Sequence, residues 1–398
     1  MPRPPALYQW RADVGKHFPH LSKPVIACLA LWSLGMIIAR SCSLTAVARS
    51  LSPLLTLKFF TVRERLRDLY REGPAKAGSQ RRTLDLSLCW APWLTWVTSQ
   101  WRQPQLAVAL DATHLGQRFI VLAVSVLYRG SAVPVAWKIL PATEKHPWNP
   151  EWATLLKHFK DVVPATWKVV VLTDRGLYAK ELFQAIQAVG WHPLMRIRAQ
   201  GYFRPAGWHH WRRLDKLIQR TGQRWQSQAT VFKNAPGQLV CTLLASWEEG
   251  HAEPWLVVTD LVPQAADICW YGLRAWIEQG FKETKSGGWQ WQHTRMTDAA
   301  RAERLWLALA VATWWLLAVG GAAESAVAAE TLGPVPDTHG QRRPTWRLVA
   351  VFQRGWALLM AAFLNHERLP RATGHPEPWP TMLPAPTGPQ TRKKNLHL

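Results

Sequence analysis

The stretch from Tyr271 to Lys285, YGLRAWIEQGFKETK, determines how the rest of the chain is interpreted. Its apolar side chains predict a helix that packs on a core. Residues seven apart lie nearly above one another on an α-helix, so Tyr271, Glu278 and Lys285 share a face, which Arg274 joins. A salt-bridged surface helix is the commonest origin of such a pattern. A carboxylate between two cations and a phenol also suits a site that handles phosphates.

The composition favours an anionic polymer as partner. The 398 residues allow two or three domains, and 48 basic against 26 acidic residues give a formal net charge of +22. Nucleic acid is the first expectation from this charge, and an acidic membrane surface the second. The 26 tryptophans offer flat faces on which bases can stack. The five cysteines form no Cys-x-x-Cys pair, which argues against a zinc site or a disulfide scaffold and fits a reducing cytoplasm.

Two aspartates stand where apolar segments end, Asp111 after residues 106–110 and Asp174 after residues 167–173. Either could be an ordinary turn or cap residue. Together with Glu278 they predict a metal site at the edge of a sheet. Further strands are expected at 119–127, 132–137 and 193–198, and helices at 150–162 and 178–189. This order predicts an α/β fold with a mixed sheet covered by helices.

The N-terminal region is expected to be helical and basic. Helices are predicted at 1–20, 22–40, 43–51 and 61–71, with a turn near 52–53. Residues 40–82 hold ten Lys or Arg against three Asp or Glu. This outline suits a helix-turn-helix reader of DNA or a small bundle with a solvated basic face. In the first case the DNA-binding side chains would be Arg63, Arg65 and Arg67.

The remaining regions complete the predicted domain order. Residues 198–264 are expected to be a basic, tryptophan-bearing β-rich insertion, and the apolar run 305–323 a buried helix or, alternatively, a membrane span. A linker at 332–345, a helix at 346–365 and a disordered Pro-rich tail from 369, ending in Arg392-Lys-Lys, should follow. The predicted domains are a helix-turn-helix-like region at 1–82, the first part of a catalytic core at 83–197, the insertion at 198–264, the second part of the core at 265–330, and a C-terminal helix and tail at 331–398.

The spacing Tyr271-x2-Arg274-x3-Glu278-x6-Lys285 resembles the Tyr-Arg-Glu-Lys signature of bacterial insertion-sequence transposases of the Asp-Asp-Glu class. Residues 110–113 resemble the first aspartate motif of that class and residues 173–176 the second. The resemblance covers about half of the chain, residues 106–315. It implies a ribonuclease H-like mixed sheet as catalytic core, interrupted by a β-rich insertion before the glutamate helix, with helical regions at both ends of the chain.

The resemblance also implies a reaction and a metal cofactor. Asp111, Asp174 and Glu278 would be the catalytic residues and would hold two Mg²⁺ ions, for which Mn²⁺ can substitute. The enzyme would cut and join insertion-sequence ends, by cut-and-paste through a hairpin intermediate. Its partners would be double-stranded DNA with terminal inverted repeats, target DNA and a second copy of itself. It would act in the cytoplasm at the nucleoid, without a membrane.

The signature implies DNA contacts beside the metal ligands. Tyr271, Arg274 and Lys285 would hold a distorted DNA backbone, with Arg274 making the two-pronged contact to phosphate. Trp255 precedes the apolar strand that leads to the signature, so it would stack on a displaced base or else pack in the core.

Three other functions compete with this interpretation. A catalytically silent or domesticated relative would bind DNA as a regulator, but it predicts a broken acidic triad, whereas all three carboxylates are present. A membrane protein built around residues 305–323 is the second. A hydrolase acting on another substrate through paired carboxylates is the third, and it would not need a charge of +22.

Overall fold

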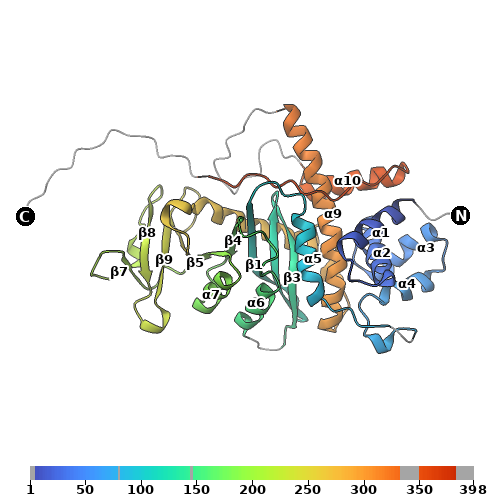
Figure 1. Cartoon of the computed structure of the whole chain (residues 1–398), viewed down its shortest axis with the longest axis horizontal. Helices are drawn as coiled ribbons and strands as arrows, with labels where there is room; N and C mark the ends of the chain where they lie inside the picture. The colour runs from blue at the N-terminus through green and yellow to red at the C-terminus, as the bar shows by residue number, and fades with distance from the viewer. Residues whose placement is uncertain (1–4, 79–80, 144–146, 332–348, 382–398) are drawn as a thin grey trace, which may run out of the picture.

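The computed structural model describes residues 5–78, 81–143, 147–331 and 349–381, with side chains for all of these except 327–331. An N-terminal helical bundle lies at one end of the molecule, and a row of antiparallel strands lies at the other (Figure 1). The helices are α1 (Pro5–His17), α2 (Lys23–Ala39), α3 (Leu44–Leu55), α4 (Phe59–Arg67), α5 (Ser87–Thr98), α6 (Trp148–Lys157), α7 (Lys180–Ala188), α8 (Trp276–Thr284), α9 (Ala299–Thr331) and α10 (Val351–Leu364). The strands are β1 (Gln105–Leu115), β2 (Phe119–Tyr128), β3 (Ser131–Pro141), β4 (Lys168–Thr173), β5 (His192–Arg196), β6 (Tyr202–Pro205), β7 (Arg212–Arg213), β8 (Arg224–Val231), β9 (Leu239–Ser246) and β10 (Trp255–Thr259).

All of these strands belong to one sheet, in the order β3-β2-β1-β4-β5-β10-β9-β8-β6-β7. Strands β1, β4 and β5 run parallel, while β2 and β3 are antiparallel to their neighbours. This five-stranded part is the ribonuclease H-like core, so the predicted fold class is confirmed. The insertion strands continue the same sheet, because β10 pairs antiparallel with β5.

The alternation of side chains along β1 assigns the two faces of the core sheet. Val108 and Leu110 point into the larger hydrophobic core, whereas Ala107 and Ala109 face the smaller core formed with α8. Successive side chains of a strand point to opposite faces. Asp111 therefore lies on the same face as the two alanines, toward α8.

Some local predictions were wrong at their boundaries, and one helix was not predicted at all. Strand β1 does not end at Asp111, because its pairing with β2 continues to Leu115, although its pairing with β4 ends at Leu110. Helix α3 does not turn at 52–53 but includes Pro53, since the backbone bond lost there falls in the last turn. Helix α5, in a stretch for which no element was predicted, packs against β3.

The signature segment is not one continuous α-helix. Ile268–Ala275 forms a 3₁₀ stretch, η5, and α8 begins only at Trp276. A 3₁₀ helix has about three residues per turn, so the seven-residue alignment of Tyr271 with Glu278 does not hold across the junction. Lys285 follows the last residue of α8 as its C-cap.

The apolar run 305–323 lies within α9 and is buried, as predicted. Trp306, Trp314 and Trp315 are at most 1 % exposed. The segment Ala299–Ala326 is long and apolar enough to cross a membrane, but 94 % of its apolar window is buried inside the protein. The alternative of a membrane span is therefore not needed to explain this helix.

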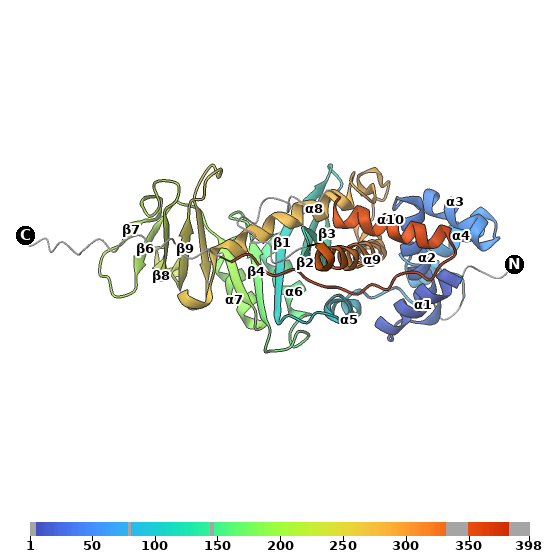
Figure 2. The ribbon, with the colours of Figure 1, turned by 90° about the horizontal axis from the view of Figure 1, so that it is seen from above.

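The described part of the C-terminal tail is ordered against the protein, which corrects the expectation of disorder from 369. Residues 365–381, called the strap below, run along the molecule after α10 (Figure 2). Gln9 of α1 donates a hydrogen bond to the carbonyl of Leu369 at 2.7 Å, and the Trp379 ring meets the Trp270 ring edge-on. These partners explain the order of a segment without regular secondary structure. The linker at 332–345 and Arg392 lie outside the described residues.

Candidate active site

Three carboxylates converge on one guanidinium at the edge of the core sheet. Nη2 of Arg274 lies 2.8 Å from Oδ2 of Asp111 and 4.0 Å from Oδ2 of Asp174. Its Nη1 lies 3.4 Å from Oε1 of Glu278. The structure thus brings together the two aspartates and the glutamate that the sequence singled out. They come from β1, from the residue after β4 and from α8.

The three carboxylates differ in their contact with water. The side chain of Asp111 is 19 % exposed, that of Asp174 42 % and that of Glu278 69 %. Burial raises the pKa of Asp111, the nearby charges of Asp174 and Glu278 raise it further, and Arg274 opposes them. The positive charge of Arg274 therefore favours the ionised form of Asp111 against the effect of burial.

Backbone amides orient both aspartates. The N–H of Ala112 donates to Oδ1 of Asp111 at 2.8 Å, and the N–H of Arg175 donates to Oδ1 of Asp174 at 2.6 Å. In each case one carboxylate oxygen is held by the backbone while the other faces Arg274. This arrangement fixes the rotation of both side chains.

A glycine allows α8 to approach the sheet closely. A Cβ atom on Gly280 would lie 2.9 Å from both the Cβ and the carbonyl oxygen of Ala132 on β3. Real Cβ contacts are essentially never that short, so any larger residue would push α8 outward. Gly280 follows Glu278 by two residues, and it therefore helps set the depth at which that carboxylate lies.

The other signature residues lie beside the carboxylates with different partners. Lys285 donates from Nζ to Oγ1 of Thr113 at 2.7 Å, two residues beyond Asp111 on the same face of β1. Tyr271 is buried, and its hydroxyl donates to the carbonyl of Thr173 at 3.3 Å. Burial raises the pKa of Tyr271 to about 12. As placed, this phenol supports the end of β4 rather than presenting a free hydroxyl to solvent.

Trp255 lies edge-on against the ring of Tyr271, with 5.1 Å between ring centroids. Its side chain is partly buried at the start of β10. Trp255 therefore adjoins the site, as its place before the signature strand suggested.

The predicted DNA-binding arginines lie apart from the carboxylates, on α4 of the N-terminal bundle (Figure 1). Helices α3 and α4 are joined by residues 56–58, a short connection of the helix-turn-helix kind. Arg63 and Arg67 both pair with Glu64, at 3.3 and 2.9 Å, whereas Arg65 is exposed.

The carboxylates suit a hard divalent cation by their chemistry. Carboxylate oxygens are the preferred ligands of Mg²⁺ and Mn²⁺. Within the described residues, however, no three His, Cys, Asp or Glu side chains are arranged to hold a metal ion. At Asp111, Asp174 and Glu278 the guanidinium of Arg274 lies at the centre and supplies the positive charge. The chemistry of these donors thus suits such a cation, whereas their described arrangement is a cluster of carboxylates around a guanidinium.

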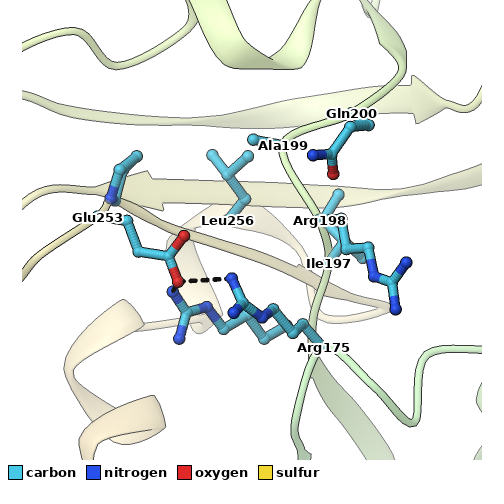
Figure 3. A pocket seen from close by; sticks show the side chains of 9 residues that line it. Arg175, Ile197, Arg198, Ala199, Gln200, Glu253 and Leu256 are labelled. Atoms are coloured by element: carbon cyan, nitrogen blue, oxygen red, sulfur yellow. Dashed lines mark hydrogen bonds and ion pairs between the residues drawn. The ribbon is translucent and has the colours of Figure 1, made fainter.

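A pocket beside the site was not predicted from the sequence. Glu253, just before β10, accepts from Arg175 at 2.6 Å and from Arg196 of β5 at 2.8 Å (Figure 3). The sequence indicated this pocket only through Arg175, which directly follows Asp174. Arg196 and Glu253 are 57 residues apart and meet only because β5 and β10 are neighbours in the sheet.

Comparison with known families matches about half of the chain. No curated protein matches the chain. A family model described as the transposase DDE domain matches residues 107–315, which include most of β1, β4, the insertion, α8 and α9 as far as residue 315. Members of this family act on DNA and generally use divalent metal ions. Because the match covers more than half of the 398 residues, the chain belongs to the family of DDE transposases.

Proposed function

We propose that the protein cuts and joins the ends of an insertion sequence, with Asp111, Asp174 and Glu278 as its catalytic carboxylates. The observation that carries this proposal is their convergence on the single guanidinium of Arg274. Two of them come from parallel strands, whose carboxyl ends form the rim where α/β sheets bind ligands. A surface ion-pair network would not need a backbone N–H on both aspartates.

The three carboxylates would hold two Mg²⁺ or Mn²⁺ ions. When bound, such ions stabilise charge on the attacking and leaving oxygens of an in-line displacement. A water would attack the phosphodiester at the element's end, break the P–O bond and leave a 3′-hydroxyl. That hydroxyl would attack the phosphodiester of the opposite strand, which forms a hairpin and releases a 3′-hydroxyl on the flanking DNA. A second water would open the hairpin and restore the 3′-hydroxyl of the element, which would then attack target DNA and release a 3′-hydroxyl of the target.

Basic side chains of the signature would hold the DNA. Arg274 becomes free to pair with a phosphate once its role at the carboxylates has been taken over by cations. Lys285 lies beside Thr113, where its positive charge faces the same edge of the sheet. Trp255 would receive the displaced base, because it adjoins the site and part of its ring is accessible. This assigns the two basic positions of the Tyr-Arg-Glu-Lys signature a DNA role beside its carboxylate, while Tyr271 supports the end of β4.

The N-terminal bundle would recognise the terminal inverted repeats. Arg65 is exposed on α4. Arg63 and Arg67 would contribute to DNA binding by replacing their contact with Glu64 by one with a phosphate. Binding both ends of one element requires two copies, so we propose a homodimer in the active complex. The place of action would be the cytoplasm, at the nucleoid.

Cleavage of the element's own ends tests the proposal. A duplex made from the DNA flanking the gene, incubated with Mg²⁺, should be nicked and then cut, and a gel time course resolves nicked, hairpin and double-strand-cut products. Asp111→Asn, Asp174→Asn and Glu278→Gln should each abolish cutting and retain binding in a mobility-shift assay. Cutting that survives these substitutions would remove the catalytic assignment. Binding without cutting by the wild type would favour a regulatory DNA-binding relative.

A further inference from the structure

A pocket of about 440 Å³ opens beside the candidate active site. Its lining includes Arg175 and Arg196, a third arginine at Arg198, and Glu253 (Figure 3). The volume lies within the ~300–1,000 Å³ of ordinary ligand pockets. Three arginines and one carboxylate line the pocket, so it keeps a surplus of positive charge even with every group ionised.

The two arginine contacts meet at a single carboxylate oxygen. Oε1 of Glu253 lies 2.6 Å from Nη1 of Arg175 and 2.8 Å from Nη2 of Arg196. Arginine forks bind carboxylates and phosphates with the same hydrogen-bond geometry. The carboxylate of Glu253 is half exposed, at 50 %, while Arg196 is only 16 % exposed. The acidic partner can therefore leave more easily than the arginine on the strand.

The pocket is joined to the catalytic residues by short connections. Arg175 follows Asp174 directly and donates its backbone N–H to that carboxylate. The charge of Arg196 acts on the hydroxyl of Tyr271. Glu253 precedes Trp255 by two residues, and Trp255 packs on the same tyrosine. An anion bound between the two arginines would thus lie next to the site of strand cleavage.

We propose that this pocket binds one backbone phosphate of the DNA beside the scissile bond, and that Glu253 occupies the place of that phosphate in the free protein. The inference rests on the proposed function, since it takes DNA as the substrate. In this arrangement Glu253 competes with DNA for Arg175 and Arg196. It thereby lowers the affinity for DNA whose phosphate must displace it from the pocket.

A matched pair of variants tests the competition. Glu253→Gln and Glu249→Gln each remove one negative charge from an exposed side chain of the same β9–β10 connection, but only the first frees the two arginines. Anisotropy of a fluorescein-labelled blunt duplex measures affinity over a range of salt concentrations. Glu253→Gln should bind roughly threefold to tenfold tighter than Glu249→Gln. The slope of its log affinity against log salt concentration should stay close to that of Glu249→Gln, because the same phosphate is neutralised in both complexes.

Two further results decide between the proposal and its alternatives. Adding Arg196→Gln to Glu253→Gln should remove the gain in affinity and make the salt dependence shallower by up to about 0.9, because one phosphate loses its arginine partner. Equal binding by Glu253→Gln and Glu249→Gln, with unfolding midpoints showing that both are folded, would overturn the inference. These binding measurements need no cleavage. Failure of the wild type to cut its own ends would refute the proposed function while leaving the phosphate site standing.

Discussion

Replacing Arg274 by Gln should destabilise the metal-free protein, because it leaves three carboxylates facing one another without a cation. Arg274 and Asp111 are 16 % and 19 % exposed, so their contact is a largely buried ion pair. Removing one partner of such a pair costs about 3–5 kcal/mol. The more exposed contacts to Asp174 and Glu278 add at most about 1 kcal/mol each. Proton uptake by Asp111, whose pKa burial already raises, limits the loss, so we expect about 3 kcal/mol.

Mg²⁺ should reverse much of this loss in the variant. In the wild type a divalent cation must displace the guanidinium, whereas in Arg274→Gln the carboxylates are open. Mg²⁺ should therefore raise the urea midpoint of the variant more than that of the wild type. Urea unfolding followed by far-ultraviolet circular dichroism, with and without Mg²⁺ and without DNA, measures both effects. Arg295→Gln, at an exposed arginine, is the control for loss of a positive charge. A loss below ~1 kcal/mol, the scale of a surface pair, or equal stabilisation of both proteins by Mg²⁺, would refute the reasoning.

Three other substitutions probe separate parts of the structure. Gly280→Ala should displace α8 from Ala132 and sharply reduce DNA cutting while leaving duplex binding intact. A variant that cuts DNA normally would show that the close approach of α8 to β3 is not needed. Trp255→Ala should slow the hairpin step about tenfold or more and leave the first nick unchanged, since base stacking is worth about 1–3 kcal/mol. Equal slowing of both steps on a gel time course would mean that the Trp255 ring packs within the protein and does not bind a base. The pKa of Glu72 is lowered to about 2, chiefly by Arg301, so this carboxylate stabilises the fold above its unfolded pKa and loses that effect as pH falls toward 2. Wild type and Glu72→Gln should therefore differ in unfolding midpoint at neutral pH and not in acid. The difference should correspond to less than ~1 kcal/mol, because Glu72 is 37 % exposed. A difference that persisted at the lowest pH would contradict the pairing.

The sequence was a good guide to the carboxylates because strand geometry is local. Apolar segments that end in aspartate, on strands that pair in parallel, must bring their ends to one edge. The alternation that puts Ala107 and Ala109 on the α8 face also puts Asp111 there, and Val170 and Leu172 do the same for Asp174. The buried helix was predicted correctly for a similar reason, since a continuous apolar run needs a core.

Features that depend on distant segments could not be predicted in this way. Helical spacing placed Arg274 beside Glu278, but its contact with Asp111, 163 residues earlier, required η5 to pack against β4, the neighbour of β1 in the sheet. The change from a 3₁₀ to an α-helix inside the signature has no marker in the sequence. Arg196 and Glu253 meet through a strand pairing that joins the insertion to the core. In each case the missing information is tertiary, because propensity and period describe only neighbours along the chain.

The strap makes the packing of α1 and η5 depend on a segment that is synthesised much later than either. The hydrogen bond from Gln9 to Leu369 joins residues 360 positions apart, and Trp379 reaches the segment that carries Tyr271 and Arg274. At ~5–20 residues per second, α1 leaves the ribosome on the order of ~20–70 seconds before its partner is made. A product that stops between Glu278 and the strap, through a frameshift or a nonsense codon, contains the three proposed catalytic carboxylates but lacks Trp379, which packs on Trp270 of η5. Translation through the strap is thus a condition for this packing beside the site.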